Sequence, residues 1–158
     1  MRISDFKKLC QQLQRANGCE QIPMRVSANL HLEYPEHYNP VAVYDMGNKS
    51  FVFAQEYIKE FSEQTCLGLI LHEIAHWLHE TEVTPKKGEY NISNKFYSEF
   101  LMEPHGKIYQ GIFLSLVKKY PLHPLLINIF KKNGNQNSMG IIRSWEKGCI
   151  KLYPELVK

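Results

Sequence analysis

Two histidines and a glutamate within an apolar run have the residue types and spacing to bind a metal ion. The run LGLILHEIAHWLHE, residues 67–80, contains His72, Glu73 and His76. His72 and His76 are four residues apart, so on a helix they share one face, one turn apart. Two imidazoles in that relation can both bond one Zn²⁺ at about 2.0–2.1 Å. Glu73 could then accept a proton from a water molecule that the zinc activates.

The residues around this pattern favour a metal site over chance. Burying two imidazoles and a carboxylate without partners costs free energy, whereas metal ligation satisfies them. The surrounding residues indicate that this part of the helix is buried, because they are apolar or small: Leu67, Leu69, Ile70, Leu71, Ala75, Trp77 and Leu78. His79 lies seven residues after His72, two turns along the helix. We therefore expect His79 outside the ligand set, at the rim, behind a ligand or in solvent.

A catalytic zinc site has three protein ligands and one open position. The downstream candidates for the third ligand are Glu89, Glu99, Glu103 and His105. Glu99 lies within a helix predicted at 93–102. His105 lies between Pro104 and Gly106, directly before a helix predicted at 106–119. The residue types alone leave the choice open.

The two histidine motifs together resemble those of the SprT-like zinc metallopeptidases, which are related to the Spartan proteases. They read His72-Glu73-Ile74-Ala75-His76 and His105-Gly106-Lys107-Ile108-Tyr109, and the likeness covers about residues 41–119. It implies a zincin-like fold, zinc held by His72, His76 and His105, and Glu73 as the general base. It also implies a zinc metalloendopeptidase, with a protein or peptide as substrate. The chain departs from the family by an inserted helix at 93–102 and by lacking the cysteine zinc ribbon found in many members.

A second segment supports an alternative third ligand. NKFYSEFLM, residues 94–102, is similar to the N-x-F-A-x-E-L-L-M-P segment of ImmA/IrrE-type metallopeptidases. In that family a glutamate a few residues before the asparagine completes the site, and Glu89 lies one step out of register with it. A site closed by Glu99 or Glu89 would also suit non-haem iron. A further alternative is a module that binds protein or DNA with little proteolysis, but Glu73 favours an enzyme.

The whole chain has the composition of one globular domain. It has 158 residues, of which 44% are hydrophobic, and a net charge of +3. Its lysines form only doublets, so a DNA partner is compatible with the sequence but not indicated by it. No signal peptide is recognisable, and the longest apolar stretch is too short to cross a bilayer. The cysteines are scattered, at 10, 19, 66 and 149, so we expect a soluble cytoplasmic protein without a disulfide framework.

Residue patterns predict the elements that position the site. Strands are expected at 22–30, 41–45 and 50–55, the last two as a hairpin, followed by an active-site helix at 57–80. A first helix should start near Ser4 and end near Asn17-Gly18. Early strands and late helices predict an α+β fold with a small antiparallel sheet packed on the active-site helix and C-terminal helices. We expect strand 50–55 to be the edge that pairs with substrate. Tyr97 and Tyr109 adjoin candidate ligands and could contact an oxyanion, although core packing is the simpler role.

Overall fold

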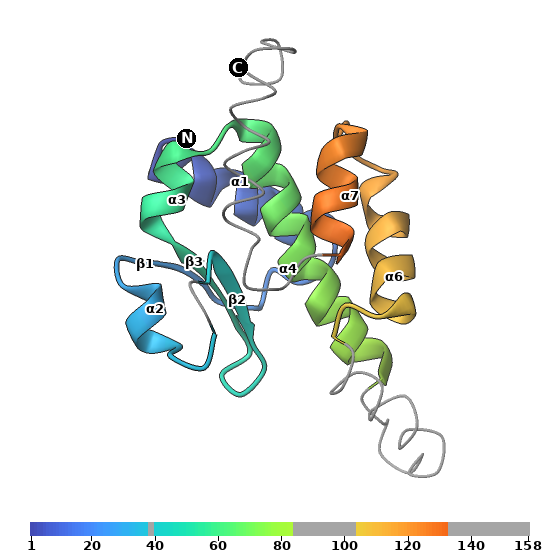
Figure 1. The fold of residues 1–158 in the computed structure, drawn as a ribbon, viewed down its shortest axis with the longest axis horizontal. Coiled ribbons are helices and arrows are strands. Elements are labelled where there is room, and N and C mark those ends of the chain that lie inside the picture. Colours follow the sequence, from blue (N-terminus) through green and yellow to red (C-terminus); the bar gives the residue numbers. More distant parts are fainter. Residues whose placement is uncertain (38–39, 84–103, 133–158) are drawn as a thin grey trace.

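The computed structural model describes residues 1–37, 40–83 and 104–132. Figure 1 shows a small sheet beside a long central helix, with further helices around that helix. This arrangement confirms the predicted α+β class. In chain order the elements are α1 Ile3–Ala16, β1 Met24–Ser27, α2 Leu30–Glu33, β2 Ala42–Asp45, β3 Ser50–Ala54, α3 Gln55–Glu60, α4 Glu63–Val83, α6 Lys107–Val117 and α7 Pro124–Lys132. The helix predicted at 93–102 lies outside the described residues.

The sheet has the strand order β1-β3-β2, and it is mixed rather than antiparallel. β3 pairs antiparallel with β2, as the predicted hairpin requires, but parallel with β1. β3 is therefore the central strand of the described sheet, and the prediction that it forms the substrate-pairing edge is wrong. The physical reason is its apolar sequence: Phe51, Val52 and Phe53 are all buried, and a strand that buries both faces belongs in the middle of a sheet. Among the described strands, β1 and β2 are the outer ones.

The predicted active-site helix is two helices, because the chain bends at Phe61-Ser62 between α3 and α4. Ser62 caps α4: its Oγ accepts a hydrogen bond from the backbone N–H of Thr65 at 3.2 Å. The first strand is shorter than predicted, and a short helix, α2, replaces part of the loop expected after it. α1 ends at Ala16, close to the predicted stop, and Gly18 follows with φ of 71°.

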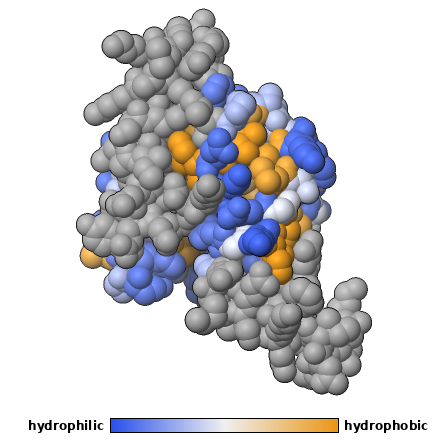
Figure 2. Space-filling model, turned by 45° about the vertical axis from the view of Figure 1, so that its right-hand side comes forward, coloured by the Kyte–Doolittle hydropathy of each residue, from blue (hydrophilic) through white to orange (hydrophobic). Residues whose placement is uncertain are grey.

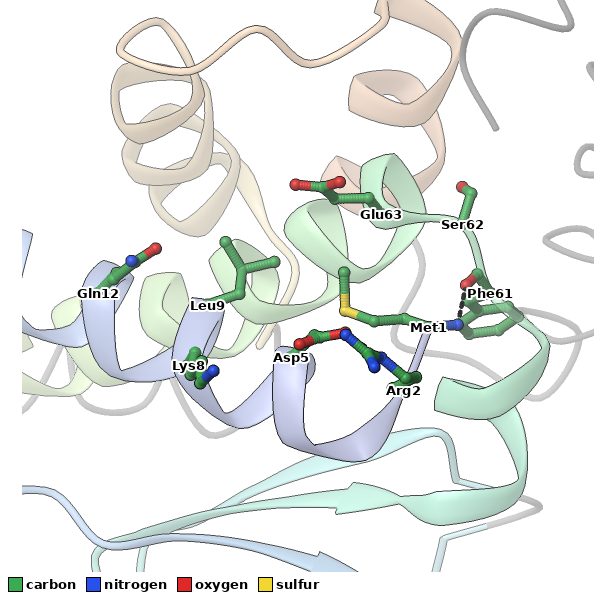
Figure 3. A pocket seen from close by; sticks show the side chains of 9 residues that line it. All are labelled: Met1, Arg2, Asp5, Lys8, Leu9, Gln12, Phe61, Ser62 and Glu63. Atoms are coloured by element: carbon green, nitrogen blue, oxygen red, sulfur yellow. Dashed lines mark hydrogen bonds and ion pairs between the residues drawn. The ribbon is translucent and has the colours of Figure 1, made fainter. Parts of the chain in front are cut away.

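The start of α4 is tied to α1 and α3. The Met1 ammonium donates hydrogen bonds to the backbone oxygens of Ile58 at 3.0 Å and Phe61 at 2.8 Å, at the end of α3. Figure 3 shows the surface pocket beside this contact, where Leu9 of α1 and Glu63 of α4 face each other across the opening. Of the candidate ligands that the structure describes, His72, His76 and His105, none lines this pocket.

α6 and α7 pack against α4 on the side away from the sheet (Figure 1). They bury Phe113, Leu126 and Phe130 almost completely. Figure 2 shows this side of the molecule, where apolar residues are visible between polar ones. α4 is thus enclosed by the sheet on one side and by two helices on the other, which explains why its sequence is apolar nearly all round.

Candidate metal centre

Three imidazoles converge where α4 meets the start of α6. His72 and His76 lie one turn apart on α4, and His105 lies just before α6. Nε2 of His72 is 3.2 Å from Nε2 of His76 and 3.2 Å from Nε2 of His105. All three ligand atoms lie within 4.8 Å of one another. Tetrahedral zinc with bonds of about 2.0–2.1 Å places its ligand nitrogens about 3.3 Å apart, so this cluster fits a metal ion and leaves one coordination position for another molecule.

Burial keeps these imidazoles neutral. It is the main cause that lowers the pKa of His72 to about 3 and that of His105 to about 4, and it lowers the pKa of His76 well below its ordinary value. Repulsion between neighbouring imidazoles acts in the same direction. A neutral imidazole carries one N–H and one lone pair, and the lone pair is what a metal ion binds. The cluster is therefore ready for a metal ion at neutral pH without losing protons.

Two groups contact Nδ1 of His72, the ring nitrogen that does not face the other histidines. Its Nδ1 lies 2.6 Å from the backbone oxygen of Phe130 on α7 and 2.8 Å from the hydroxyl of Tyr109 on α6. The Tyr109 hydroxyl also donates to the backbone oxygen of His72 at 3.0 Å. A carbonyl can only accept, so the proton belongs on Nδ1, and Nε2 keeps the lone pair that faces the other histidines.

Tyr109 has a more specific place than core packing. It is fully buried, and its ring stacks on that of His76 with centroids 4.5 Å apart. Burial, together with the nearby Glu73 charge, raises the pKa of Tyr109 well above its ordinary value, so the phenol stays protonated. Its hydroxyl is engaged with His72 rather than directed at an oxyanion. Tyr97, the other tyrosine considered, lies outside the described residues.

Glu73 is on α4, and its side chain contacts the backbone of β2. Burial raises the pKa of its carboxyl to about 8, against the lowering effect of a hydrogen bond from the backbone of Tyr44. The backbone oxygen of Val41 accepts from the N–H of Ala54 at 2.8 Å. Because backbone groups alternate in direction along an antiparallel strand, those of Ala42 and Tyr44 then point away from β3. Glu73 is thus a buried carboxyl that contacts β2, an outer strand of the described sheet.

His79 is fully buried, so the expectation that it could lie in solvent or at a rim is wrong. Its ring centroid is 6.2 Å from that of Tyr109, behind the ligand cluster. α6 covers this face of α4, and only the packing of α6 reveals that burial. His79 is not one of the three grouped imidazoles.

Glu80 is a buried residue that the sequence reasoning missed. It accepts hydrogen bonds from the Tyr44 hydroxyl on β2 and from Lys49 Nζ in the hairpin turn. These contacts hold the β2–β3 hairpin against the second half of α4, next to Glu73. No local signal distinguished Glu80 from a solvated charge, because its partners lie 31 and 36 residues earlier in the chain.

The other candidate ligands Glu89, Glu99 and Glu103 lie outside the described residues. Comparison with models of known protein families, with curated proteins and with solved structures gives no match. Within the described part of the chain, no helix combines the length and apolar character needed to cross a membrane.

Proposed function

We propose that this chain is a zinc-dependent metallopeptidase of the SprT-like type, with a zincin-like arrangement of sheet and active-site helix. His72, His76 and His105 would be the zinc ligands, and Glu73 the general base. The observation that carries this proposal is the convergence of three Nε2 atoms, two pairs of them 3.2 Å apart, with the buried Glu73 directly after His72 on the same helix. Three histidine ligands with one open position are typical of catalytic rather than structural zinc.

Glu73 has the properties that proton transfer needs. When bound, zinc would supply Lewis acidity, lowering the pKa of a water molecule and polarising a peptide carbonyl. With zinc bound, the nearby cation would favour the ionised form of the buried Glu73 carboxyl, which could then accept a proton from that water molecule and return it to the leaving amine. A module that only bound metal would have no use for a carboxyl buried at this cost, and this supports an enzyme over a binding module.

The outer edge of β2 suits an extended peptide substrate. The backbone groups of Ala42 and Tyr44 point outward there, but the Tyr44 N–H donates to Glu73, so Ala42 and the Tyr44 carbonyl are the groups that a peptide could pair with. A peptide could add to this edge by main-chain hydrogen bonds. Because β2 packs along α4, the scissile bond of that peptide would lie on the side of β2 that faces the helix with His72 and His76. β2 thus takes the role that the sequence reasoning assigned to strand 50–55.

The presence of His105 in the cluster bears on the iron alternative. Non-haem iron sites of the usual type combine two histidines with one carboxylate, whereas the third imidazole here is within 4.8 Å of the other two. This favours zinc over iron. If Glu99 or Glu89 were the third ligand instead of His105, the site would favour iron.

Zinc titration into metal-free variants tests the ligand set. We expect His72→Ala and His105→Ala to lose zinc affinity sharply, while Glu99→Gln and Glu89→Gln keep the wild-type value. If a glutamate variant loses zinc and His105→Ala does not, the SprT-like proposal is wrong and a carboxylate completes the site.

Proteolysis is tested separately on the zinc-loaded protein. Unfolded casein and a quenched-fluorescence peptide library are suitable substrates, with Glu73→Gln as the inactive control. We expect Glu73→Gln to retain zinc and fold but to lose cleavage. Equal cleavage by wild type and this variant would contradict the role given to Glu73.

A further inference from the structure

α7 reaches the candidate metal centre through its backbone. The oxygen of Phe130 lies 2.6 Å from Nδ1 of His72, although the two residues are 58 positions apart. His72 is the middle ligand, since its Nε2 is 3.2 Å from the Nε2 of each of the other two imidazoles. Whatever sets the proton position and the angle of this ring therefore sets the geometry of the whole cluster.

Gly68 permits this approach. It lies one turn before His72 on α4, and its missing side chain is the space in which the Phe130 ring lies. A Cβ at Gly68 would be 2.6 Å from both Cδ2 and Cε2 of that ring, which is far closer than carbon atoms approach without repulsion. The Phe130 ring is only 2% exposed, so close packing leaves it little room to move aside. Any side chain at Gly68 would thus push α7 away from α4.

We propose that Gly68 and Phe130 are positioning residues of the metal centre. Gly68 allows α7 to dock so closely that the Phe130 carbonyl holds His72 in the tautomer with the proton on Nδ1. This inference rests on the proposed metal site but not on peptidase activity.

The Tyr109 hydroxyl agrees with the same tautomer. Its single proton is donated to the His72 backbone oxygen at 3.0 Å, so its oxygen can accept from Nδ1 at 2.8 Å. If α7 moved away and the Phe130 carbonyl no longer reached Nδ1, the Tyr109 hydroxyl would be its one remaining acceptor among these two groups. The tautomer with the proton on Nε2 would then become accessible. That tautomer cannot bind a metal ion until the Nε2 proton is removed.

Imidazole nitrogen NMR of the metal-free protein tests the tautomer directly. In long-range ¹⁵N–¹H spectra we expect His72 of the wild type to show a protonated Nδ1 and an unprotonated Nε2. Gly68→Ala should lose this pattern and bind zinc about 10-fold to 100-fold more weakly, the usual effect of removing a group that orients a ligand. Gly111→Ala is the matched control, because it is also a helical glycine and its added Cβ would meet nothing within 4 Å.

A compensating change separates the contact from general instability. Gly68→Ala combined with Phe130→Val removes both ring carbons that the added Cβ would meet, and it should restore the His72 pattern and most of the zinc affinity. The proposal is overturned if wild-type His72 carries its proton on Nε2, or if folded Gly68→Ala keeps the wild-type spectrum and affinity. Should Gly68→Ala not fold, a folded double variant that still lacks the Nδ1 proton also overturns it. An inactive protein with the expected spectra would refute the peptidase proposal alone.

Discussion

Replacing Glu73 with glutamine should stabilise the metal-free protein, and the gain should grow with pH. The cause is the burial of the Glu73 carboxyl, which raises its pKa from 4.5 to about 8 in the folded state. Between these values the folded protein binds a proton that the unfolded chain has released. The contribution of Glu73 to the free energy of unfolding of the wild type therefore falls as pH rises through this window. Glutamine carries no such proton, so the variant lacks this loss.

The size of the effect follows from the two pKa values. Each pH unit between them changes the free energy of unfolding by about 1.4 kcal/mol. From pH 5 to pH 8 the advantage of Glu73→Gln over the wild type should therefore grow by about 3 to 4 kcal/mol. Any difference in hydrogen bonding between the amide and the protonated carboxyl is the same at every pH, so it does not affect this growth. The three ligand histidines titrate in both proteins, so they cancel from the comparison.

Urea unfolding followed by circular dichroism, in chelator and across this pH range, measures the difference. Glu63→Gln is the control, because it makes the same chemical change at an exposed position in the first turn of the same helix. Saturating zinc should reduce the difference in free energy of unfolding between wild type and Glu73→Gln, because a nearby cation favours the ionised carboxylate. Parallel stability curves for wild type and Glu73→Gln would refute the burial argument for this residue.

Three further results are expected. The metal-free protein should lose stability as pH falls from about 6.5 towards 3, because the folded-state pKa of His72 is lowered to about 3 and the unfolded chain takes up the proton first; ellipticity against pH with and without zinc measures this. Gly18→Ala should lower the free energy of unfolding by about 1 kcal/mol, because Gly18 has φ of 71°; urea unfolding measures it. Tyr44→Phe should cost about 1–2 kcal/mol, because Glu80 loses a buried hydrogen-bond donor, and Tyr34→Phe, with its hydrogen bond at the less buried Asp45, should cost less in the same assay.

The parts of the molecule that depend on neighbours in the chain were predictable from sequence. The spacing of His72, Glu73 and His76 places the two histidines on one helical face whatever surrounds the helix, because the helical repeat alone determines it. The same holds for the end of α1 near Gly18 and for the β2–β3 hairpin. The break between α3 and α4 was also readable in principle, since Ser62 is a favourable N-cap residue.

Tertiary structure decided what distant residues do to one another. His105 joins His72 across 33 positions, and the Phe130 carbonyl reaches the same ring across 58. The burial of His79, the pairing of Glu80 with β2, and the choice of β2 rather than β3 as the sheet edge next to α4 are of the same kind. Each depends on which apolar faces meet in the folded chain, because side-chain packing at close contact determines whether a polar group is buried, paired or exposed. Spacing along the sequence carries no information about that contact.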